Sequence, residues 1–413
     1  MADVLDVYLN QNLAGQLQED RGGFTFAYGR AWLESDLFLP LSVTMPPTTD
    51  TFPDEVARPF FENLLPEGEI RAAIARLRQI SERNTFGLLG EIGGDCAGAI
   101  SLWPQGEKPA RHKGYTELTD ARLAEVLTDM ARRPLLVVDD GLRLSLAGAQ
   151  NKLPVHYDGK KLSLPRGNQP SSHILKPGAQ GFGQMPANEH FCMRLAAAIG
   201  LPVPDSTILR KPEALYLVDR YDRVRSPDGT LSRIHQIDFC QALSLPSQRK
   251  YEHEGGPSLE ACFEVITRYS ARPARDRFHL MTWVIFNFLV GNADAHAKNL
   301  SLLITHEGVM LAPFYDLVST AVYRELTDKL SLKIGGENRP EWVRKRHWEK
   351  LAEISGANPR IVRRQLDQLP STIAGMARDT AGRLGLNPTE VATVDRILSV
   401  ITERAARLRG TLK

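Results

Sequence analysis

Hydrophobic and polar positions alternate near the N-terminus and then change to a helical period. Residues 4–9 and 23–28 alternate, and the turn-forming Asn10-Gln11-Asn12 follows the first run. Such alternation is typical of half-buried β-strands. From Pro59 to Ile80 the apolar residues recur at helical spacing, and a further strand is expected over residues 97–103. We therefore expect residues 1–105 to form one module with strands and helices.

A polar, proline-containing stretch over residues 104–113 predicts a linker. Beyond it the pattern predicts helices over residues 117–133 and 188–199, the second ending at Gly200. Short strands are expected at residues 142–146, 153–157, 173–175 and 214–218. From residue 241 onward the periodicity is almost wholly helical. Residues 275–290 are apolar on most faces and predict a buried helix.

Composition excludes several classes of protein. The chain has 413 residues, of which 42% are hydrophobic and 24% charged, as in ordinary globular domains. The net charge of +2 is too small for binding a polyanion over the whole surface. The acidic N-terminus has no signal-peptide pattern, and the most apolar stretch, residues 281–290, is about half of a membrane span. The cysteines lack metal-binding or CxxC spacing, so we expect reduced thiols and a cytoplasmic location.

The most informative segment is Gly-Asn-Ala-Asp-Ala-His-Ala-Lys-Asn at residues 291–299, directly after the predicted buried helix. Asp294 and Asn299 have the spacing of the Asp and Asn in the protein-kinase catalytic loop. Phosphoryl transfer needs a carboxylate that receives the proton of the attacking hydroxyl, and an oxygen ligand for the metal that spans the phosphates. Asp294 and Asn299 are candidates for these roles.

A second carboxylate, Asp316, follows Asp294 by 22 residues, much as the metal-binding Asp of kinases follows their catalytic loop. Residues 300–304 and 309–311 predict a small hairpin, which would return Asp316 to Asn299. Mg²⁺ accepts one or two carboxylates together with phosphate oxygens, so Asn299 and Asp316 suffice as protein ligands. Each residue alone also fits an ordinary loop cap or turn, and the combination favours catalysis.

Other candidates are weaker when taken singly. Small residues in the segment 145–152, Ser-Leu-Ala-Gly-Ala-Gln-Asn-Lys, would let backbone N–H groups approach phosphates, although an ordinary hairpin turn fits as well. Lys176 ends a strand and Glu189 opens a helix, which would suit a lysine–glutamate pair beside the phosphates or two unrelated surface residues. His296 suits a structural or phosphate-contacting role, because Asp294 already fills the role of base. No HExxH spacing supports a zinc hydrolase.

Together these segments resemble the HipA family, the serine/threonine kinase toxins of bacterial toxin–antitoxin systems. The resemblance extends to Asp-Phe-Cys-Gln at 238–241, Pro-Phe-Tyr-Asp-Leu at 313–317 and Asn-Leu-Leu-Pro-Glu-Gly at 63–68, and it covers nearly the whole chain. It implies an α+β, bilobal protein-kinase-like fold with an extra N-terminal α/β module and an all-α C-terminal lobe. The implied domains are an N-terminal module (1–105), an N-lobe-like region with the phosphate loop (115–240) and a helical C-lobe with the catalytic loop (241–413).

The resemblance also implies roles for single residues. Asp294 matches the catalytic base, Asn299 and Asp316 match the ligands of Mg²⁺, and Ser145 matches the serine that the family autophosphorylates. A phosphoserine would repel ATP from the neighbouring phosphate site and silence the enzyme. The implied ATP contacts are Ala147, Gly148, Ala149, Gln150, Asn151, Lys152, Lys176, Glu189, Ile237, Asp238, Phe239, His296, Lys298 and Tyr315. Ile237 and Ala295 depart mildly from the family pattern.

Partners follow from the resemblance as well. The family implies a HipB-like helix-turn-helix antitoxin, operator DNA bound through that complex, and an aminoacyl-tRNA synthetase as substrate, with glutamyl-tRNA synthetase the best guess. Residues 341–413 carry 14 Lys and Arg against 8 Asp and Glu, which fits either DNA proximity or a solvated helical surface. Two other hypotheses remain open: a small-molecule kinase of aminoglycoside or choline type, and a non-catalytic module that binds an antitoxin.

Overall fold

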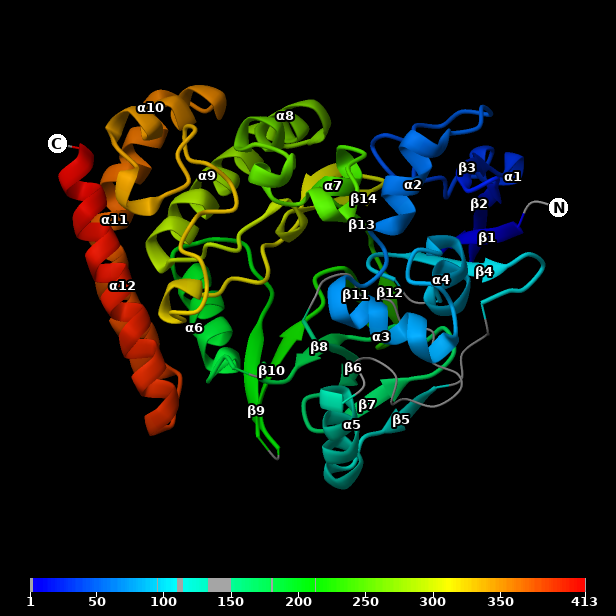
Figure 1. The fold of residues 1–413 in the computed structure, drawn as a ribbon, viewed down its shortest axis with the longest axis horizontal. Helices are drawn as coiled ribbons and strands as arrows, with labels where there is room; N and C mark the ends of the chain where they lie inside the picture. Colours follow the sequence, from blue (N-terminus) through cyan, green and yellow to red (C-terminus); the bar gives the residue numbers. More distant parts are fainter. Residues whose placement is uncertain are drawn as a thin grey trace. The chain divides into compact units, whose positions relative to one another are not determined.

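The computed structural model describes residues 3–94, 96–109, 114–132, 150–179, 181–211 and 213–412 (Figure 1). The chain divides into two compact units, and each gathers segments that are distant in the sequence. Unit 1 comprises Met1–Pro177, Asp219–Ser247 and Leu303–Glu307, and unit 2 comprises Gly178–Val218, Gln248–Leu302 and Gly308–Lys413. Helices and antiparallel strands both occur, which confirms the α+β class. The predicted boundaries near residues 105, 115 and 240 stay a prediction.

The first sheet of unit 1 has the order β3-β2-β1-β4, with antiparallel neighbours. Its strands are β1 (Asp3–Leu9), β2 (Asn12–Asp20), β3 (Gly23–Tyr28) and β4 (Ile100–Pro104). The alternation in β3 reflects a face on which Phe24, Phe26 and Tyr28 are all buried. β4 starts later than predicted, because residues 97–99 form a turn around Gly98, whose φ is +73°.

The residues from Pro59 to Ile80, which were predicted as one helical run, belong to two separate helices. The prediction of a continuous helix was therefore wrong. The helices of this region are α1 (Arg30–Leu33), α2 (Asp54–Glu62), α3 (Gly68–Arg78) and α4 (Thr85–Ile92). α2 ends at Asn63, whose side-chain Nδ2 donates to the carbonyl of Pro59 at 2.7 Å. Pro66 follows, and Gly68 opens α3 with a φ of +55° that ordinary helix residues avoid.

A second sheet in unit 1 contains, in spatial order, β5 (Tyr115–Glu117), β7 (Leu162–Pro165), β6 (Leu153–Tyr157) and β8 (His173–Lys176). The helix α5 (Asp120–Arg132) follows β5. These elements confirm the predictions for residues 117–133, 153–157 and 173–175 to within a few positions. The strand predicted at 142–146 lies outside the described residues. The remaining elements are the hairpin β11 (Arg223–Arg225) and β12 (Leu231–Arg233), then β13 (His235–Asp238) and α7 (Phe239–Ala242).

Two of the family-like motifs hold the N-terminal part of unit 1 to its later segments. Asn63 Nδ2 also donates to the carbonyl of Leu245 at 2.8 Å, and Gln241 Nε2 donates to the carbonyl of Phe60 at 2.9 Å. Asp238 caps α7 by accepting from the Gln241 amide at 2.8 Å, while its own amide donates to Gln241 Oε1 at 2.9 Å. This reciprocal capping box orients Gln241 toward α2.

A buried carboxylate, Asp222, makes a further link within unit 1. Its Oδ2 accepts from the amide of Gly98 at 3.0 Å and from Arg220 Nη2 at 2.7 Å. The guanidinium of Arg223 donates to the carbonyl of Gly98 at 3.2 Å. Burial favours the neutral acid, but the Arg220 and Arg223 charges prevail and hold the pKa of Asp222 far below its ordinary value. The buried charges are therefore mutually compensated.

Unit 2 is built mainly from helices. They are α6 (Met185–Ala198), α8 (Leu259–Tyr269), α9 (Pro273–Val290), α10 (Lys345–Ile354), α11 (Pro359–Arg383) and α12 (Pro388–Leu412), with short turns η1 (Ser247–Arg249), η2 (Glu252–Glu254), η3 (Ala297–Asn299), η4 (Thr320–Val322) and η5 (Pro340–Trp342). Its strands are β9 (Ser206–Arg210), β10 (Ala214–Asp219) and β15 (Gly308–Leu311), and β14 (Ser301–Thr305) begins in unit 2 and ends in unit 1. The long helices α11 and α12 lie side by side (Figure 1).

The helix α9 is the core of unit 2. Every residue from Leu280 to Val290 is buried, as the apolar run predicted, and the helix ends at Gly291 in the left-handed region with a φ of +76°. α6 starts earlier than the predicted residue 188, because Pro186 fits the first turn of a helix. The strands β14 and β15 correct the expectation of an all-α C-terminal lobe, although they were predicted as a hairpin. Among the described residues, no helix is long and apolar enough to span a membrane.

We predict that Gly98→Ala destabilises unit 1 more than a change at another glycine with positive φ. A Cβ at Gly98 would lie 2.7 Å from the backbone nitrogen of Gln236, whereas a Cβ at Gly159, with a φ of +96°, meets no atom within 4 Å. The free energy of unfolding should fall by about 3 kcal/mol or more for Gly98→Ala, and by about 1 kcal/mol for Gly159→Ala. Chemical denaturation measures both values, and equal losses would contradict the account.

Stability should also fall in mild acid because of His235. Burial lowers the pKa of this histidine from 6.5 to about 4, while its Nε2 donates to the carbonyl of Leu41 at 2.7 Å. The unfolded chain takes up a proton near pH 6.5 and the folded chain does not, so stability is lost as pH falls through this window. We expect a loss of roughly 2 kcal/mol between pH 7 and pH 5, reduced in His235→Gln. The exposed His306→Gln is the control, and a slope that persists unchanged in His235→Gln would refute this origin.

Candidate active site

The catalytic-loop candidate, residues 291–299, begins where α9 ends. Gly291 is required there, because a Cβ would lie 2.7 Å from the Ala321 Cβ and 2.9 Å from the Val400 Cγ1. The carbonyl of Gly291 accepts from the Thr320 hydroxyl at 3.0 Å, and the same hydroxyl oxygen accepts from the Ala293 amide at 2.8 Å. The first residues of the loop are therefore fixed to the helix end and to η4.

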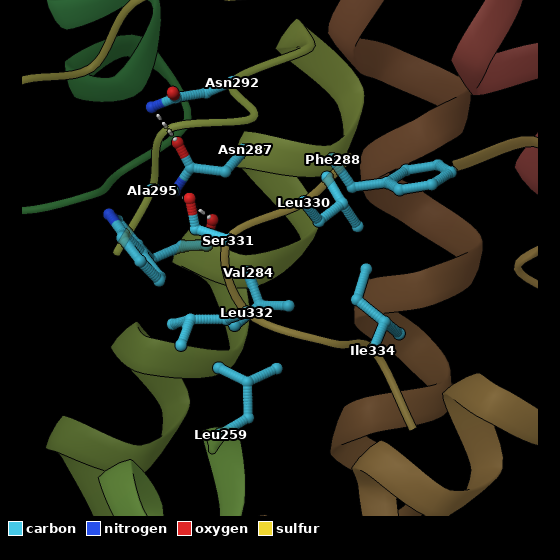
Figure 2. Close-up of a pocket in the computed structure, with 11 residues that line it drawn as sticks. Leu259, Val284, Asn287, Phe288, Asn292, Ala295, Leu330, Ser331, Leu332 and Ile334 are labelled. Atoms are coloured by element: carbon cyan, nitrogen blue, oxygen red, sulfur yellow. Dashed lines mark hydrogen bonds between the residues drawn. The ribbon is translucent and has the colours of Figure 1, made fainter. Parts of the chain in front are cut away.

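Two asparagines determine how the chain turns toward Asp294. Asn292 Nδ2 donates to Asn287 Oδ1 at 2.8 Å (Figure 2). Asn292 Oδ1 accepts from the Asp294 amide at 3.1 Å. On the other side, Ser331 donates from its hydroxyl to the Ala293 carbonyl at 2.6 Å. Every one of these supports is a neutral hydrogen bond, so the loop is positioned without placing another charge near Asp294.

Figure 2 also shows a mostly apolar pocket behind this loop. Its cavity volume of about 20 Å³ holds roughly one water molecule, which is too small for a nucleotide. The pocket therefore belongs to the packing that supports the loop and is not the reaction site. The residues that line it are Leu259, Trp283, Val284, Asn287, Phe288, Asn292, Ala295, Leu330, Ser331, Leu332 and Ile334.

The structure brings Asn299 and Asp316 together within unit 2. Asn299 Nδ2 donates to Asp316 Oδ2 at 3.4 Å, and Asn299 Oδ1 accepts from the His296 amide at 3.1 Å. The predicted hairpin between them is present, because the Ala312 amide donates to the Ser301 carbonyl at 2.9 Å and closes β14 against β15. Residues 17 positions apart thus meet at one place.

Asp316 adopts a backbone conformation that is less common for aspartate than for glycine. Its φ is +54°, in the left-handed region, where the short polar side chains of Asp and Asn are among the best tolerated of the non-glycine residues. The segment before it is fixed by Tyr315, whose hydroxyl donates to the Lys298 carbonyl at 2.6 Å and shares a hydrogen bond of 2.8 Å with Ser301. A strained residue at a site of converging polar groups is a common feature of functional sites.

The segment after Asp316 is clamped by Asn188 from α6. The Asn188 side chain accepts from the Ser319 amide at 2.8 Å and donates to the Ser319 carbonyl at 2.9 Å. Asn188 is fully buried, so both bonds form away from water. The two contacts match those of a neighbouring β-strand and hold the backbone three residues beyond Asp316.

Negative charge gathers in this part of unit 2. Burial raises the pKa of Tyr216 well above its ordinary value, and the carboxylates of Glu189 and Asp316 raise it further. The effect on one phenol indicates that both carboxylates lie near Tyr216 within unit 2. A cation would be stabilised at such a place.

The donor set at Asn299 and Asp316 fits a divalent metal ion of the Mg²⁺ type. It consists of a carboxylate and an amide, which are hard oxygen ligands. The Asn299 carbonyl oxygen retains a second lone pair beside the one that accepts from His296, while its amide nitrogen points to Asp316. In this arrangement Asn299 caps η3, and its role as a metal ligand stays a prediction.

The other predicted site residues divide between the units. His296 and Lys298 are buried beside Asn299, and Glu189 is buried on α6, all in unit 2. Lys176 is in unit 1, where it ends β8 and is only 4% exposed. The pairing of Lys176 with Glu189 stays a prediction.

In unit 1, the predicted adenine-contacting residues Ile237, Asp238 and Phe239 span the junction of β13 and α7. From the predicted phosphate loop, the structure describes Gln150, Asn151 and Lys152, and Asn151 Nδ2 donates to the Met130 carbonyl at 3.4 Å. Ser145, Ala147, Gly148 and Ala149 lie outside the described residues. The ATP contacts assigned to these residues stay predictions.

Sequence reasoning missed the supports of the site. Asn188 entered the sequence prediction only as the first residue of a helix, and Thr320, Ser331 and Tyr251 were not singled out. Tyr251 donates its phenolic proton to Asp294 Oδ1 at 2.8 Å. No local pattern marks these residues, because each acts on a partner far away in the sequence.

Comparison with known proteins agrees with this geometry. A model of the HipA N-terminal domain matches residues 5–103, and a model of the HipA-like C-terminal domain matches residues 144–377. A putative kinase, Y4mE, of Sinorhizobium fredii is 42% identical over 91% of this chain and 91% of its own length. The serine/threonine-protein kinase toxin HipA of Shewanella oneidensis is 32% identical over 82% of this chain and 80% of its own length.

A solved structure is similar over almost the whole length of both chains. It is the complex of HipA, HipB and operator DNA from Shewanella oneidensis, and the match has a TM-score of 0.87 with 28% identity. It covers 99% of this chain and 98% of that chain. The sequence matches, the fold and the convergence of Asn299 with Asp316 lead to one conclusion: the chain belongs to the HipA family of serine/threonine kinase toxins.

Proposed function

We propose that this chain is an ATP-dependent protein kinase in which Asp294 is the general base and Asn299 and Asp316 are the metal ligands. The observation that carries the proposal is the 3.4 Å contact between Asn299 and Asp316, formed by the loop that also contains Asp294. A kinase requires these three groups in one region. Among the hypotheses from the sequence, a non-catalytic binding module gives no reason for such convergence.

The residues would act in a simple order. Asp294, which is exposed, would accept the proton of a serine or threonine hydroxyl as that oxygen attacks the terminal phosphate. Asn299 and Asp316 would hold Mg²⁺, which when bound offsets the charge of the phosphate oxygens. His296 and Lys298, close to Asn299, would contact the phosphates, and Tyr315 would keep the two metal ligands in register through the Lys298 carbonyl.

Unit 1 would contribute to nucleotide binding. Lys176, at the end of β8, would contact the phosphates, as the strand lysine of protein kinases does. We further propose that residues 147–152 bind phosphates through their backbone amides and that Ile237 to Phe239 contact adenine. Glu189 would orient the cationic groups. These roles rest on the family membership.

The proposed substrate is a protein, and an aminoacyl-tRNA synthetase is the class expected from the family, with glutamyl-tRNA synthetase the first candidate. Blocking such an enzyme would stop aminoacylation and arrest growth. The proposed autophosphorylation at Ser145 would end the activity, since a phosphate of nearly two negative charges would repel ATP from the neighbouring loop.

A partner is proposed from the solved relative, whose complex contains HipB and operator DNA. By this analogy the chain would bind a HipB-like helix-turn-helix antitoxin and approach DNA through it. The excess of positive charge in residues 341–413 is compatible with DNA nearby.

Asp316→Asn should abolish phosphoryl transfer without unfolding unit 2. Asparagine tolerates the left-handed conformation of residue 316, so the backbone is kept while the charged metal ligand is lost. We expect the rate of transfer from γ-labelled ATP to fall at least 100-fold, and the Mg²⁺-ATP-induced rise in melting temperature to disappear. Asp395→Asn on α12 is the matched exposed control, and it should keep the wild-type rate of transfer and the Mg²⁺-ATP-induced rise in melting temperature. Retained transfer in Asp316→Asn would refute the assignment.

Ser145→Ala should remove most self-labelling and prolong activity. The expected result is loss of phosphate from the peptide that contains residue 145, measured by mass spectrometry after incubation with Mg²⁺-ATP, and longer growth arrest after induced expression. Asp294→Asn should show neither label nor arrest. Label that appears only on added metabolites would favour a small-molecule kinase, and loss of toxicity in Ser145→Ala would oppose an inhibitory role.

A further inference from the structure

The base candidate Asp294 is contacted by a tyrosine from a distant segment. Tyr251, which lies between η1 and η2, donates its hydroxyl to Asp294 Oδ1 at 2.8 Å. Its ring meets the ring of His296 edge to face, with centroids 5.2 Å apart. Tyr251 thus contacts two residues of the catalytic-loop candidate, one through hydrogen bonding and one through packing.

The backbone around Tyr251 is held in a fixed place. On one side the Lys250 carbonyl accepts from the Ala297 amide at 3.4 Å. On the other side the Glu252 amide donates to the Ser331 carbonyl at 3.2 Å. Ser331 is the residue whose hydroxyl holds the Ala293 carbonyl, so the segment around Tyr251 shares supports with the catalytic loop.

The turn that follows Tyr251 adds to this fixation. The Tyr251 carbonyl accepts from the amides of Glu254 and Gly256 at 3.0 and 2.9 Å. A side chain at Gly256 is excluded, because a Cβ there would lie 2.4 Å from the Arg249 carbonyl oxygen and 2.7 Å from that of Tyr251. A phenol carried on so constrained a segment approaches Asp294 at small cost in conformational entropy.

We propose that Tyr251 is a positioning residue, which orients the Asp294 carboxylate for proton acceptance. The inference rests on the proposed role of Asp294 as the general base. A carboxylate on an exposed loop side chain can rotate, and its rotation would separate the accepting oxygen from the incoming hydroxyl. The bond from Tyr251 to Oδ1 sets the rotation of this group, and the edge contact with His296 keeps the phenol in place.

The hydrogen bond from Tyr251 to Asp294 is compatible with a competing role as well as an orienting one. The two roles predict opposite effects on the rate of transfer. A serine hydroxyl that donates to Asp294 has to approach the carboxylate that Tyr251 already contacts. If the phenol competed with that hydroxyl, its removal would speed the transfer. If the phenol orients the carboxylate, its removal slows the transfer. We infer the orienting role, because the backbone hydrogen bonds around Tyr251 leave the phenol little freedom to withdraw.

The test compares Tyr251→Phe with wild type as the full-length chain, using γ-labelled Mg²⁺-ATP and incorporation of phosphate into the protein itself. Phenylalanine keeps the ring against His296 and removes only the hydroxyl. We expect the maximal rate to fall roughly 3- to 30-fold, the half-saturating concentration of ATP to stay within about twofold, and the melting temperature to be nearly unchanged. Tyr269→Phe, at the end of α8 in the same unit, is the matched control and should keep the wild-type rate.

The outcomes separate the two proposals. An equal or faster rate in Tyr251→Phe would overturn the orienting role, as would a loss confined to ATP affinity. A similar loss in Tyr269→Phe would assign the effect to general stability and also overturn it. Absence of any transfer by the wild-type chain would instead contradict the proposed kinase function, and with it the premise for Tyr251.

Discussion

The candidate site depends on holding an acidic and an amide side chain together at a place where the backbone is strained. Asp316 is in the left-handed region and its carboxylate lies beside Asn299, so neither arrangement would persist without support. The support comes from neutral groups. Asn188 clamps the chain after Asp316, and the Tyr315 hydroxyl joins the residue before it to the catalytic loop. Neutral hydrogen bonds therefore fix the backbone on both sides of Asp316.

The same principle explains the catalytic loop. The side chains of Asn292, Thr320 and Ser331 bind backbone atoms of residues 291–294, Asn287 orients the Asn292 side chain, and none of the four carries a charge. Behind them α9 supplies a rigid, buried base. Unit 1 uses charge differently, since Asp222 and two arginines form a compensated buried cluster far along the chain from the site residues of unit 2. Unit 2 has a structural ion pair of its own, in which Arg210 contacts the buried Glu390 at 2.6 Å.

Much of this arrangement could be predicted from sequence where the signal is local. The apolar run of α9 and the alternation of β3 predicted their elements, and the hairpin predicted between Asn299 and Asp316 predicted that these two residues meet. The sequence pattern did not predict features that depend on one side chain and a partner distant in the sequence. The break between α2 and α3 depends on Asn63, which also reaches Leu245, a partner 182 residues away. Tyr251 and Asn188 were missed for the same reason, since their contacts are made only in the folded chain.

The central claim is that Asn299 and Asp316 form the metal site of a kinase. Electron paramagnetic resonance of Mn²⁺ tests it most directly, with the full-length chain and a non-hydrolysable ATP analogue, in wild type and in Asn299→Ala. The account predicts that the wild-type chain immobilises Mn²⁺ when the analogue is present, and that Asn299→Ala weakens this binding at least tenfold while the melting temperature stays close to that of wild type. Equal Mn²⁺ binding by the two chains would contradict the account.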